Sequence, residues 1–423
     1  MSKSARRSSR RQAVKPSDLE IPKQDFLRSH LQDLVVNAGF EALGQLLESE
    51  RTAVCGPRYQ HAGEARSAYR SGHAPGELVL GGRKVSVRRP RARTLKGHEV
   101  TLPSWQKFSA EDPLEDRSVE QMLLGVASRH YGRSLETLPA EVRTRSDSKS
   151  SVSRRFVTAT QSKLDELLTR DLSEIPLLAL MIDGVHFADH VVLLALGIDR
   201  NGFKHVLGLQ EGATENATAC RSLLTNLRDR GLRTDRSILA SLDGGKALAC
   251  AVRDVFGRRA LLQRCQVHKT RNVLDHLPQS KRTSVGQALK QAYRCKDKKR
   301  AKRLLLNLAR SLRTDHPGAT ASILEGLNET LTIKPWKLSV VLERMLSTTN
   351  AIENLISSVR RVSRRVKHWQ DGSMILRWTA AGLQEAEKGF RRVRGYKNLD
   401  ILEDVLRNND RRIDGKSEDM QAA

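Results

Sequence analysis

Three acidic residues stand where carboxylates could share a divalent metal. Asp183 closes the apolar run PLLALMID, Asp243 closes the run SILASLD, and Glu353 lies early in the helical pattern TTNAIENLISSV. Acids that follow neighbouring strands project from one edge of a sheet, and a helix crossing that edge can deliver a third. Phosphodiester cleavage can use two Mg²⁺ ions about 3.5–4 Å apart, and Mg²⁺ prefers hard oxygen ligands. The pattern therefore indicates Asp183, Asp243 and Glu353 as catalytic metal ligands acting on a phosphate backbone.

Each acid also has an ordinary structural explanation. Asp183 and Asp243 both precede glycine, and such a pair after a strand often only forms a turn. Glu353 would lie in the first turn of a helix, where a carboxylate stabilises the positive end of the helix dipole. These explanations treat the residues singly, whereas the metal hypothesis accounts for all three together.

The charge balance points to a polyanionic partner. The 423 residues contain 74 Lys and Arg against 48 Asp and Glu, a net charge of +26. Such a field attracts nucleic acid, because each neutralised phosphate releases counterions. The length and the amphipathic segments make a ribosomal protein the weaker interpretation.

Several basic side chains could contact DNA phosphates near the acids. Arg360, Arg364 and Lys367 follow Glu353 and would share one helical face. Lys246 follows Asp243 at a helix start and could reach a phosphate. The alternative for each is a solvated surface charge.

No stretch of about 20 apolar residues is present, so we expect no membrane partner. The N-terminus has no apolar segment after its charges, so we expect no secretory signal. Five scattered cysteines give no disulfide framework, which suits a reducing compartment. We therefore expect a cytoplasmic protein that associates with the nucleoid when it binds DNA.

The elements that must position the acids can be read from apolar patterning. PLLALMID, HVVLLALGID and FKHVLGLQEG predict three successive strands joined by short turns. The following pattern alternates helix and strand, which gives the order β-β-β-α-β-α-β-α. From about residue 280 to residue 335 the chain is basic and predicts only helices.

The N-terminal third predicts smaller elements. Apolar residues at helical spacing over 25–51 predict one or two amphipathic helices, and residues 52–75 predict a loop. The alternating segment ELVLGGRKVSVRRPRARTLKGHEVTLP predicts a β-hairpin or a small meander. From residue 118 a helix, a connection and a second helix resemble a helix-turn-helix. Arg154 and Arg155 would then read DNA, with plain helix packing as the alternative.

Three further residues carry open alternatives. Cys265 and His268 have the C-x-x-H spacing of half a zinc site, but a structural zinc needs four ligands and no partner pair is nearby. Trp336 could stack on an unpaired base. In a chain with 4% aromatic residues, however, an isolated tryptophan more often belongs to the core.

Four blocks of the sequence resemble the mutator-type transposases of bacterial insertion sequences. They are the pair Asp183-Gly184 and the segments LDGGKALACAVRDVFG, QRCQVHKTRNVLDHLP and STTNAIENLISSVRRVSRR. The segment GGRKVSVRRPRARTLKGHEVTLP is similar to the N-terminal β segment of that family. The resemblance extends from about residue 30 to residue 400, and its C-x-x-H and T-T-N-x-x-E blocks are specific.

The resemblance implies an RNase H-like core with an Asp-Asp-Glu triad, and the strand order agrees with it. The triad falls on Asp183, Asp243 and Glu353, and the family's basic residue after the glutamate falls on Arg360. The resemblance explains the long stretch before Glu353 as an all-helical insertion. The chain departs from the family at Gly245, where other members often carry a bulkier residue.

The expected fold is α/β, an RNase H-like core with a mixed five-stranded sheet and an all-helical insertion, preceded by helical and small β regions that bind DNA. The expected parts are a disordered basic tail (1–20), an N-terminal helix and hairpin region (21–110), a helix-turn-helix-like region (111–172), the first part of the core (173–279), the insertion (280–340) and the core's C-terminal helices (341–423).

The expected function is transposition of an insertion sequence. The protein would bind terminal inverted repeats and target DNA and catalyse strand cleavage and 3′-OH strand transfer with two Mg²⁺ or Mn²⁺ ions per site. A homodimer or larger assembly would bring two DNA ends together. The alternatives are an RNase H-like nuclease without strand transfer and an inactive DNA-binding regulator.

Overall fold

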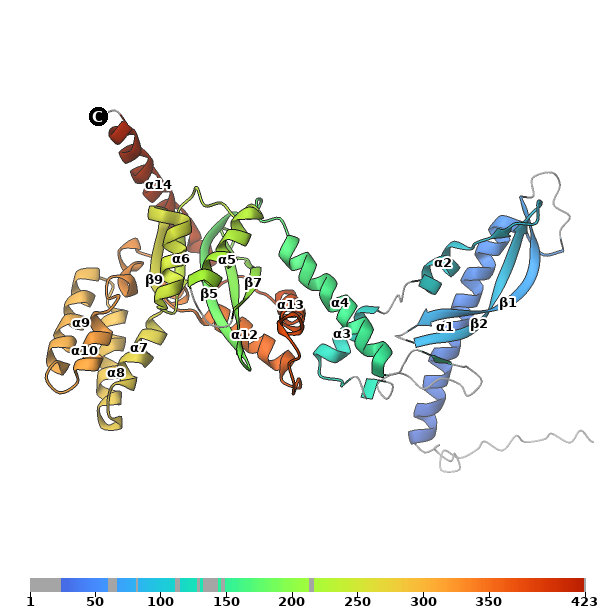
Figure 1. The fold of residues 1–423 in the computed structure, drawn as a ribbon, viewed down its shortest axis with the longest axis horizontal. Helices are drawn as coiled ribbons and strands as arrows, with labels where there is room; N and C mark the ends of the chain where they lie inside the picture. Colours follow the sequence, from blue (N-terminus) through green and yellow to red (C-terminus); the bar gives the residue numbers. More distant parts are fainter. Residues whose placement is uncertain are drawn as a thin grey trace, which may run out of the picture. The chain divides into compact units, whose positions relative to one another are not determined.

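A computed structural model describes residues 24–59, 67–80, 83–110, 115–127, 130–131, 144–145, 149–212 and 217–421 (Figure 1). The chain divides into two compact units, Met1–Ser118 with Val126–Arg155, and Val119–Gly125 with Phe156–Ala423. The expected basic tail, residues 1–20, lies outside the described residues. No helix among those described has the length and apolar character to cross a membrane.

The first unit combines one long helix with a β-hairpin. Its elements are α1 (Gln24–Cys55), β1 (Ala68–Leu80), β2 (Arg83–Thr94), β3 (Glu99–Val100), α2 (Pro103–Ala110) and β4 (Thr144–Arg145). The predicted loop over 52–75 is wrong at both ends, since α1 continues to Cys55 and β1 begins at Ala68. The N-terminal half of β1 is held by backbone pairing with β2, where Ala68 faces Thr94. Pairing with a long partner strand thus overrides a composition poor in strand formers.

The predicted helix pair corresponds to α3 (Glu115–Leu123) and α4 (Lys149–Thr169). Most of the chain between them lies outside the described residues, so the helix-turn-helix stays a prediction. Arg154 is exposed and Arg155 half-buried near the start of α4.

The second unit is built on a five-stranded mixed sheet, as the sequence predicts. Its strands are β5 (Leu177–Phe187), β6 (His190–Asp199), β7 (Lys204–Gly212), β8 (Ile238–Leu242) and β9 (Ala260–Arg264). Their spatial order is β7-β6-β5-β8-β9. The first three strands form the predicted antiparallel meander, and β8 and β9 run parallel to β5.

Helices cover both faces of this sheet. Side chains alternate between the faces along a strand, so Ala179 and Met181 of β5 join one core cluster while Leu180 and Ile182 join another. The first cluster includes residues of α12 (Asn350–Ser363), α13 (Gly372–Lys388) and α14 (Leu399–Gln421). The second includes residues of α5 (Ala217–Asp229) and α6 (Lys246–Phe256).

A helical region lies beside β9 (Figure 1) and has a core of its own. It comprises α7 (Gln266–Asp275), α8 (Gln279–Arg294), α9 (Lys298–Leu312), α10 (Pro317–Leu324), the 3₁₀ turns η4 (Glu329–Leu331) and η5 (Lys334–Trp336), and α11 (Val340–Leu346). Trp336 is half-buried and packs against the first cluster, which places it in the core rather than on an open surface. Its base-stacking role stays a prediction.

Candidate active site

The three parallel strands place chemically active residues in one row. Ile182 of β5 pairs with Leu242 of β8, and Leu242 pairs with Arg264 of β9. The next residues along the three strands are Asp183, Asp243 and Cys265. Neighbouring strands lie about 4.8 Å apart, so these residues leave the parallel part of the sheet side by side.

Asp183 does not close its strand, contrary to the prediction. β5 continues to Phe187, with Asp183 facing Leu194 of β6 and Phe187 facing His190. The long apolar run of β6 extends the pairing, so the Asp183-Gly184 pair stays extended and the turn moves to Ala188–Asp189. Pairing with β8 does end at Ile182. Asp183 therefore follows directly after the last residue of β5 that pairs with β8.

Asp183 and Asp243 line one pocket of about 180 Å³. The backbone N–H of Gly184 donates to Asp183 Oδ1 at 2.9 Å, and that of Gly245 donates to Asp243 Oδ1 at 2.8 Å. Lys246, the exposed first residue of α6, borders the same pocket. Two carboxylates with a cation and a helix N-terminus suit a metal bound to an anionic substrate.

The turn after Asp243 depends on glycine at one position only. Gly244 has a φ of +111°, and a Cβ there would lie 2.2 Å from Arg264 Nε. Gly245 has a φ of −58°, and the nearest atom to a Cβ is Asp243 Oδ1 at 3.3 Å. A side chain at position 245 would therefore fit more easily than one at position 244.

We expect Gly244→Ala to lower the free energy of unfolding by about 1–3 kcal/mol, because an L residue is strained at that φ and would collide with Arg264. Gly245→Ala is the matched control and should change it by much less. Urea denaturation of both variants checks this. Equal losses in the two variants would contradict the assigned turn geometry.

Glu353 lies in the first turn of α12, as predicted. The Thr349 hydroxyl donates to Glu353 Oε1 at 2.7 Å, and His268 Nδ1 lies 3.8 Å from the same oxygen. The apolar side of α12 packs in the cluster that contains Met181 and Val185, the residues two positions before and after Asp183. Since side chains alternate along a strand, Asp183 belongs to the face that α12 covers.

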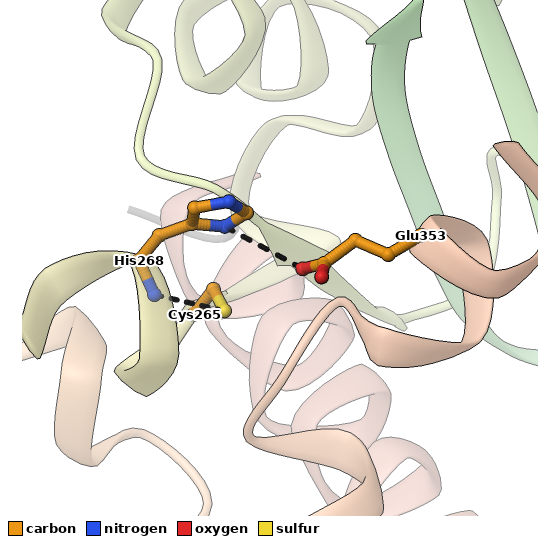
Figure 2. A group of neighbouring side chains, drawn as sticks. All are labelled: Cys265, His268 and Glu353. Carbon is orange, nitrogen blue, oxygen red and sulfur yellow. Dashed lines mark hydrogen bonds and ion pairs between the residues drawn. The ribbon is translucent and has the colours of Figure 1, made fainter. Parts of the chain in front are cut away.

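Cys265, His268 and Glu353 converge from two segments of the chain (Figure 2). Cys265 is fully buried at the N-cap of α7 and accepts from the backbone N–H of His268 at 3.5 Å. The buried Thr349 hydroxyl lies 3.4 Å from Cys265 Sγ and 3.3 Å from His268 Nδ1. The hydroxyl has one proton, which it can donate to Glu353 Oε1 or to Cys265 Sγ, and it can accept from a protonated His268.

Two hydrogen bonds hold the chain segment that leads into α12. The Ser241 hydroxyl of β8 donates to the carbonyl of Leu346, and the backbone N–H of Gln266 donates to the carbonyl of Ser347. Their lengths are 2.8 and 2.9 Å respectively. The segment that leads to Thr349 is thereby held against both β8 and the start of α7.

The thiol and the imidazole shift one another's protonation. Burial acts to raise the pKa of Cys265, but hydrogen bonds from His268 and Thr349 outweigh it and hold the pKa below its ordinary value. The hydrogen bond to Cys265 raises the pKa of His268 against the effect of burial, and the charges of Cys265, Glu353 and Asp183 add to the rise. The negative charges of Glu353 and Asp183 both favour the protonated form of His268.

The predicted basic face is shorter than expected. Arg360 lies two turns after Glu353 on the same side of α12 and is exposed. Arg364 is the exposed C-cap residue, while Lys367 lies beyond the helix. The prediction that all three share one helical face is wrong for Lys367, because α12 ends at Ser363.

Thr349 lies inside the T-T-N-x-x-E block, but the sequence assigns its hydroxyl no role in the site. Its spacing of four residues before Glu353 places that hydroxyl one helical turn before the carboxylate. The sequence also leaves the role of Cys265 and His268 open, and the structure brings both to Glu353.

Comparisons with known proteins agree on one family. The family model described as "Transposase, Mutator family" matches residues 13–393. The transposase for insertion sequence element ISRM5 of Rhizobium meliloti is 27% identical over 370 residues, which cover 85% of this chain and 89% of that protein. The transposase for insertion sequence element IS256 in transposon Tn4001 of Staphylococcus aureus is 24% identical over 391 residues. These residues cover 87% of this chain and 94% of that protein.

Proposed function

The chain belongs to the Mutator family of transposases, and from that premise we propose that it cuts DNA at the ends of an insertion sequence and joins them to target DNA. The observation that carries this proposal is the row formed by Asp183 and Asp243 after the paired residues Ile182 and Leu242. Glu353 approaches from α12 on the face to which Asp183 belongs. The three carboxylates are the proposed catalytic residues.

We interpret the second unit as an RNase H-like core. An antiparallel meander of three strands followed by two strands parallel to the first supports this interpretation. The helices from α8 to α11 would be the insertion between the second aspartate and the glutamate.

Carboxylate oxygens are hard donors, so Asp183, Asp243 and Glu353 fit Mg²⁺ or Mn²⁺. When bound, two such ions would activate the attacking oxygen and stabilise the leaving oxygen of an in-line displacement. The glycine N–H groups that bond Asp183 and Asp243 hold each carboxylate in one orientation. Thr349 does the same for Glu353.

The reaction would proceed in two displacements at phosphorus. First a water oxygen attacks the phosphate at the element's end, and the 3′ oxygen leaves and is protonated to a 3′-OH. That 3′-OH then attacks a phosphate of the target, forming one P–O bond as another breaks. Lys246 at the pocket and Arg360 on α12 would hold the phosphates between them.

Cleavage and joining can be followed with labelled DNA that carries the element's terminus and a target plasmid. We expect Mg²⁺-dependent nicks at the terminus and products joined to the plasmid. Nicks without joined products would indicate a nuclease instead. Binding without nicks would indicate a DNA-binding regulator and would overturn the enzymatic proposal.

We expect Arg360→Ala to weaken DNA binding and to lower the slope of log affinity against log salt by about 1, the share of one phosphate contact. Arg228→Ala is the matched control, because Arg228 is an exposed arginine on α5 paired with Asp229. Fluorescence anisotropy over a range of salt concentrations measures both. An unchanged slope for Arg360→Ala would remove Arg360 from the interface.

A further inference from the structure

The cluster of Cys265, His268 and Glu353 offers three different metal-binding groups. One ligand atom from each residue lies within 4.8 Å of the others (Figure 2). They are a sulfur, an imidazole nitrogen and a carboxylate oxygen. This set differs in kind from the oxygen-only set proposed for Mg²⁺.

The chemistry of the donors selects the ion. Thiolate and imidazole favour zinc and similar thiophilic cations, while Mg²⁺ and Mn²⁺ favour carboxylates and water. Three protein ligands and one open position form a common zinc coordination. The Thr349 hydroxyl, within 3.4 Å of all three ligand atoms, adds a further oxygen to the group.

The cluster is both pre-formed and reachable. Cys265 is fixed by the start of α7, and the α12 segment is tied to α7 through Ser347 and Gln266. The side chains of His268 and Glu353 are 21% and 34% exposed. An ion can therefore enter from solvent while the buried thiol closes the inner side.

We propose that Cys265, His268 and Glu353 bind Zn²⁺ or a similarly thiophilic divalent cation, and that this binding withdraws Glu353 from the carboxylates that hold Mg²⁺. The thiol proton of Cys265 is released to solvent as the ion binds. The metal site follows from the cluster alone, whereas its inhibitory effect rests on the proposed function. Zinc would then act as an off-switch for DNA cleavage.

Cobalt(II) replaces zinc in such sites and reports on its ligands by absorption, so it is the first probe. The intact chain should bind about one Co²⁺ with a thiolate charge-transfer band, and excess Zn²⁺ should abolish the band. Cys265→Ser should lose it. Cys250→Ser, which removes an exposed thiol beside Asp254, is the matched control and should keep it. A band absent from the intact chain, or retained by Cys265→Ser, would overturn the site.

His268→Gln is a second test of the site in case Cys265→Ser misfolds. His268 is only half-buried, whereas Cys265 is fully buried. If circular dichroism shows that Cys265→Ser is unfolded, His268→Gln decides the test. It should weaken Co²⁺ binding by at least roughly 10–100-fold. Unchanged affinity in a folded His268→Gln chain would contradict the proposal.

The inhibitory effect of Zn²⁺ on DNA cleavage is tested by a separate measurement. Zn²⁺ titrated against a fixed Mg²⁺ concentration should inhibit DNA cleavage by the intact chain, and Cys250→Ser should be inhibited equally. Cobalt binding without any cleavage would contradict the proposed function and leave the metal site standing. Cleavage insensitive to Zn²⁺, in a chain that binds Co²⁺ through Cys265, would contradict the withdrawal of Glu353.

Discussion

Replacing Glu353 by glutamine is expected to lower Mg²⁺-dependent cleavage by roughly 10²–10³-fold or more, the scale of loss when a group that stabilises the transition state is removed. Glutamine keeps the size of the side chain and an oxygen that can accept from Thr349, so α12 should stay in place. It removes the negative charge that makes the carboxylate a ligand for Mg²⁺. The decisive measurement is a cleavage time course beside a DNA-binding titration.

Glu403→Gln is the matched control, since Glu403 of α14 forms an ion pair with Arg407 and lies beside the first residues of β5 and β8, at the opposite end of these strands from Asp183 and Asp243. It should leave cleavage unchanged. Asp183→Asn and Asp243→Asn should reproduce the loss seen for Glu353→Gln. Full cleavage by Glu353→Gln, with DNA binding intact, would show that another acid completes the set.

Thr349→Val is expected to produce the second largest loss, roughly 10–100-fold in cleavage, as for other residues that orient metal ligands. Valine has nearly the shape of threonine but lacks the hydroxyl that contacts Glu353, Cys265 and His268. The side chain is fully buried, so no water replaces the lost hydrogen bond readily. DNA affinity should not change, because Thr349 is not a surface residue.

Thr349→Ser separates positioning from packing. Serine restores the hydroxyl and removes one methyl group, so it should recover most of the cleavage that valine loses. The activation of both variants by Mg²⁺ should be compared, because a displaced Glu353 raises the Mg²⁺ concentration needed. Equal defects in the two variants would assign the loss to packing instead.

The central sheet could be predicted because its strands are long apolar runs. The residues of β5 and β6 are mostly buried on both faces of the sheet, so their apolar runs stand out in the sequence. Asp243 after β8 and Glu353 in the first turn of α12 followed from the same patterns. Burial of Ile352, Leu355, Ile356 and Val359 matches the predicted periodicity of α12.

Register could not be predicted in the same way. The row of Asp183, Asp243 and Cys265 depends on which residues of β5, β8 and β9 pair, and apolar runs fix no such alignment. The end of β5 could not be predicted either, because an Asp-Gly pair favours a turn until a long neighbouring strand holds it extended.

Contacts between segments that are far apart in the sequence were the hardest feature to predict. Nothing local to Thr349 indicates that its hydroxyl meets Cys265, which lies 84 residues away in the chain. The C-x-x-H spacing left the role of Cys265 and His268 open, and only the fold brings Glu353 of α12 to them. The end of α12 at Ser363 likewise follows no strong stop signal in its basic sequence.

The central claim is that Asp183, Asp243 and Glu353 hold the same metal ions. Binding of Mn²⁺ to the intact chain on a DNA end, followed by electron paramagnetic resonance, tests it most directly. We predict that Asp183→Asn, Asp243→Asn and Glu353→Gln each weaken Mn²⁺ binding, while Glu403→Gln does not. Undiminished Mn²⁺ binding by Glu353→Gln would contradict the claim, since Glu353 would then lie outside the metal site.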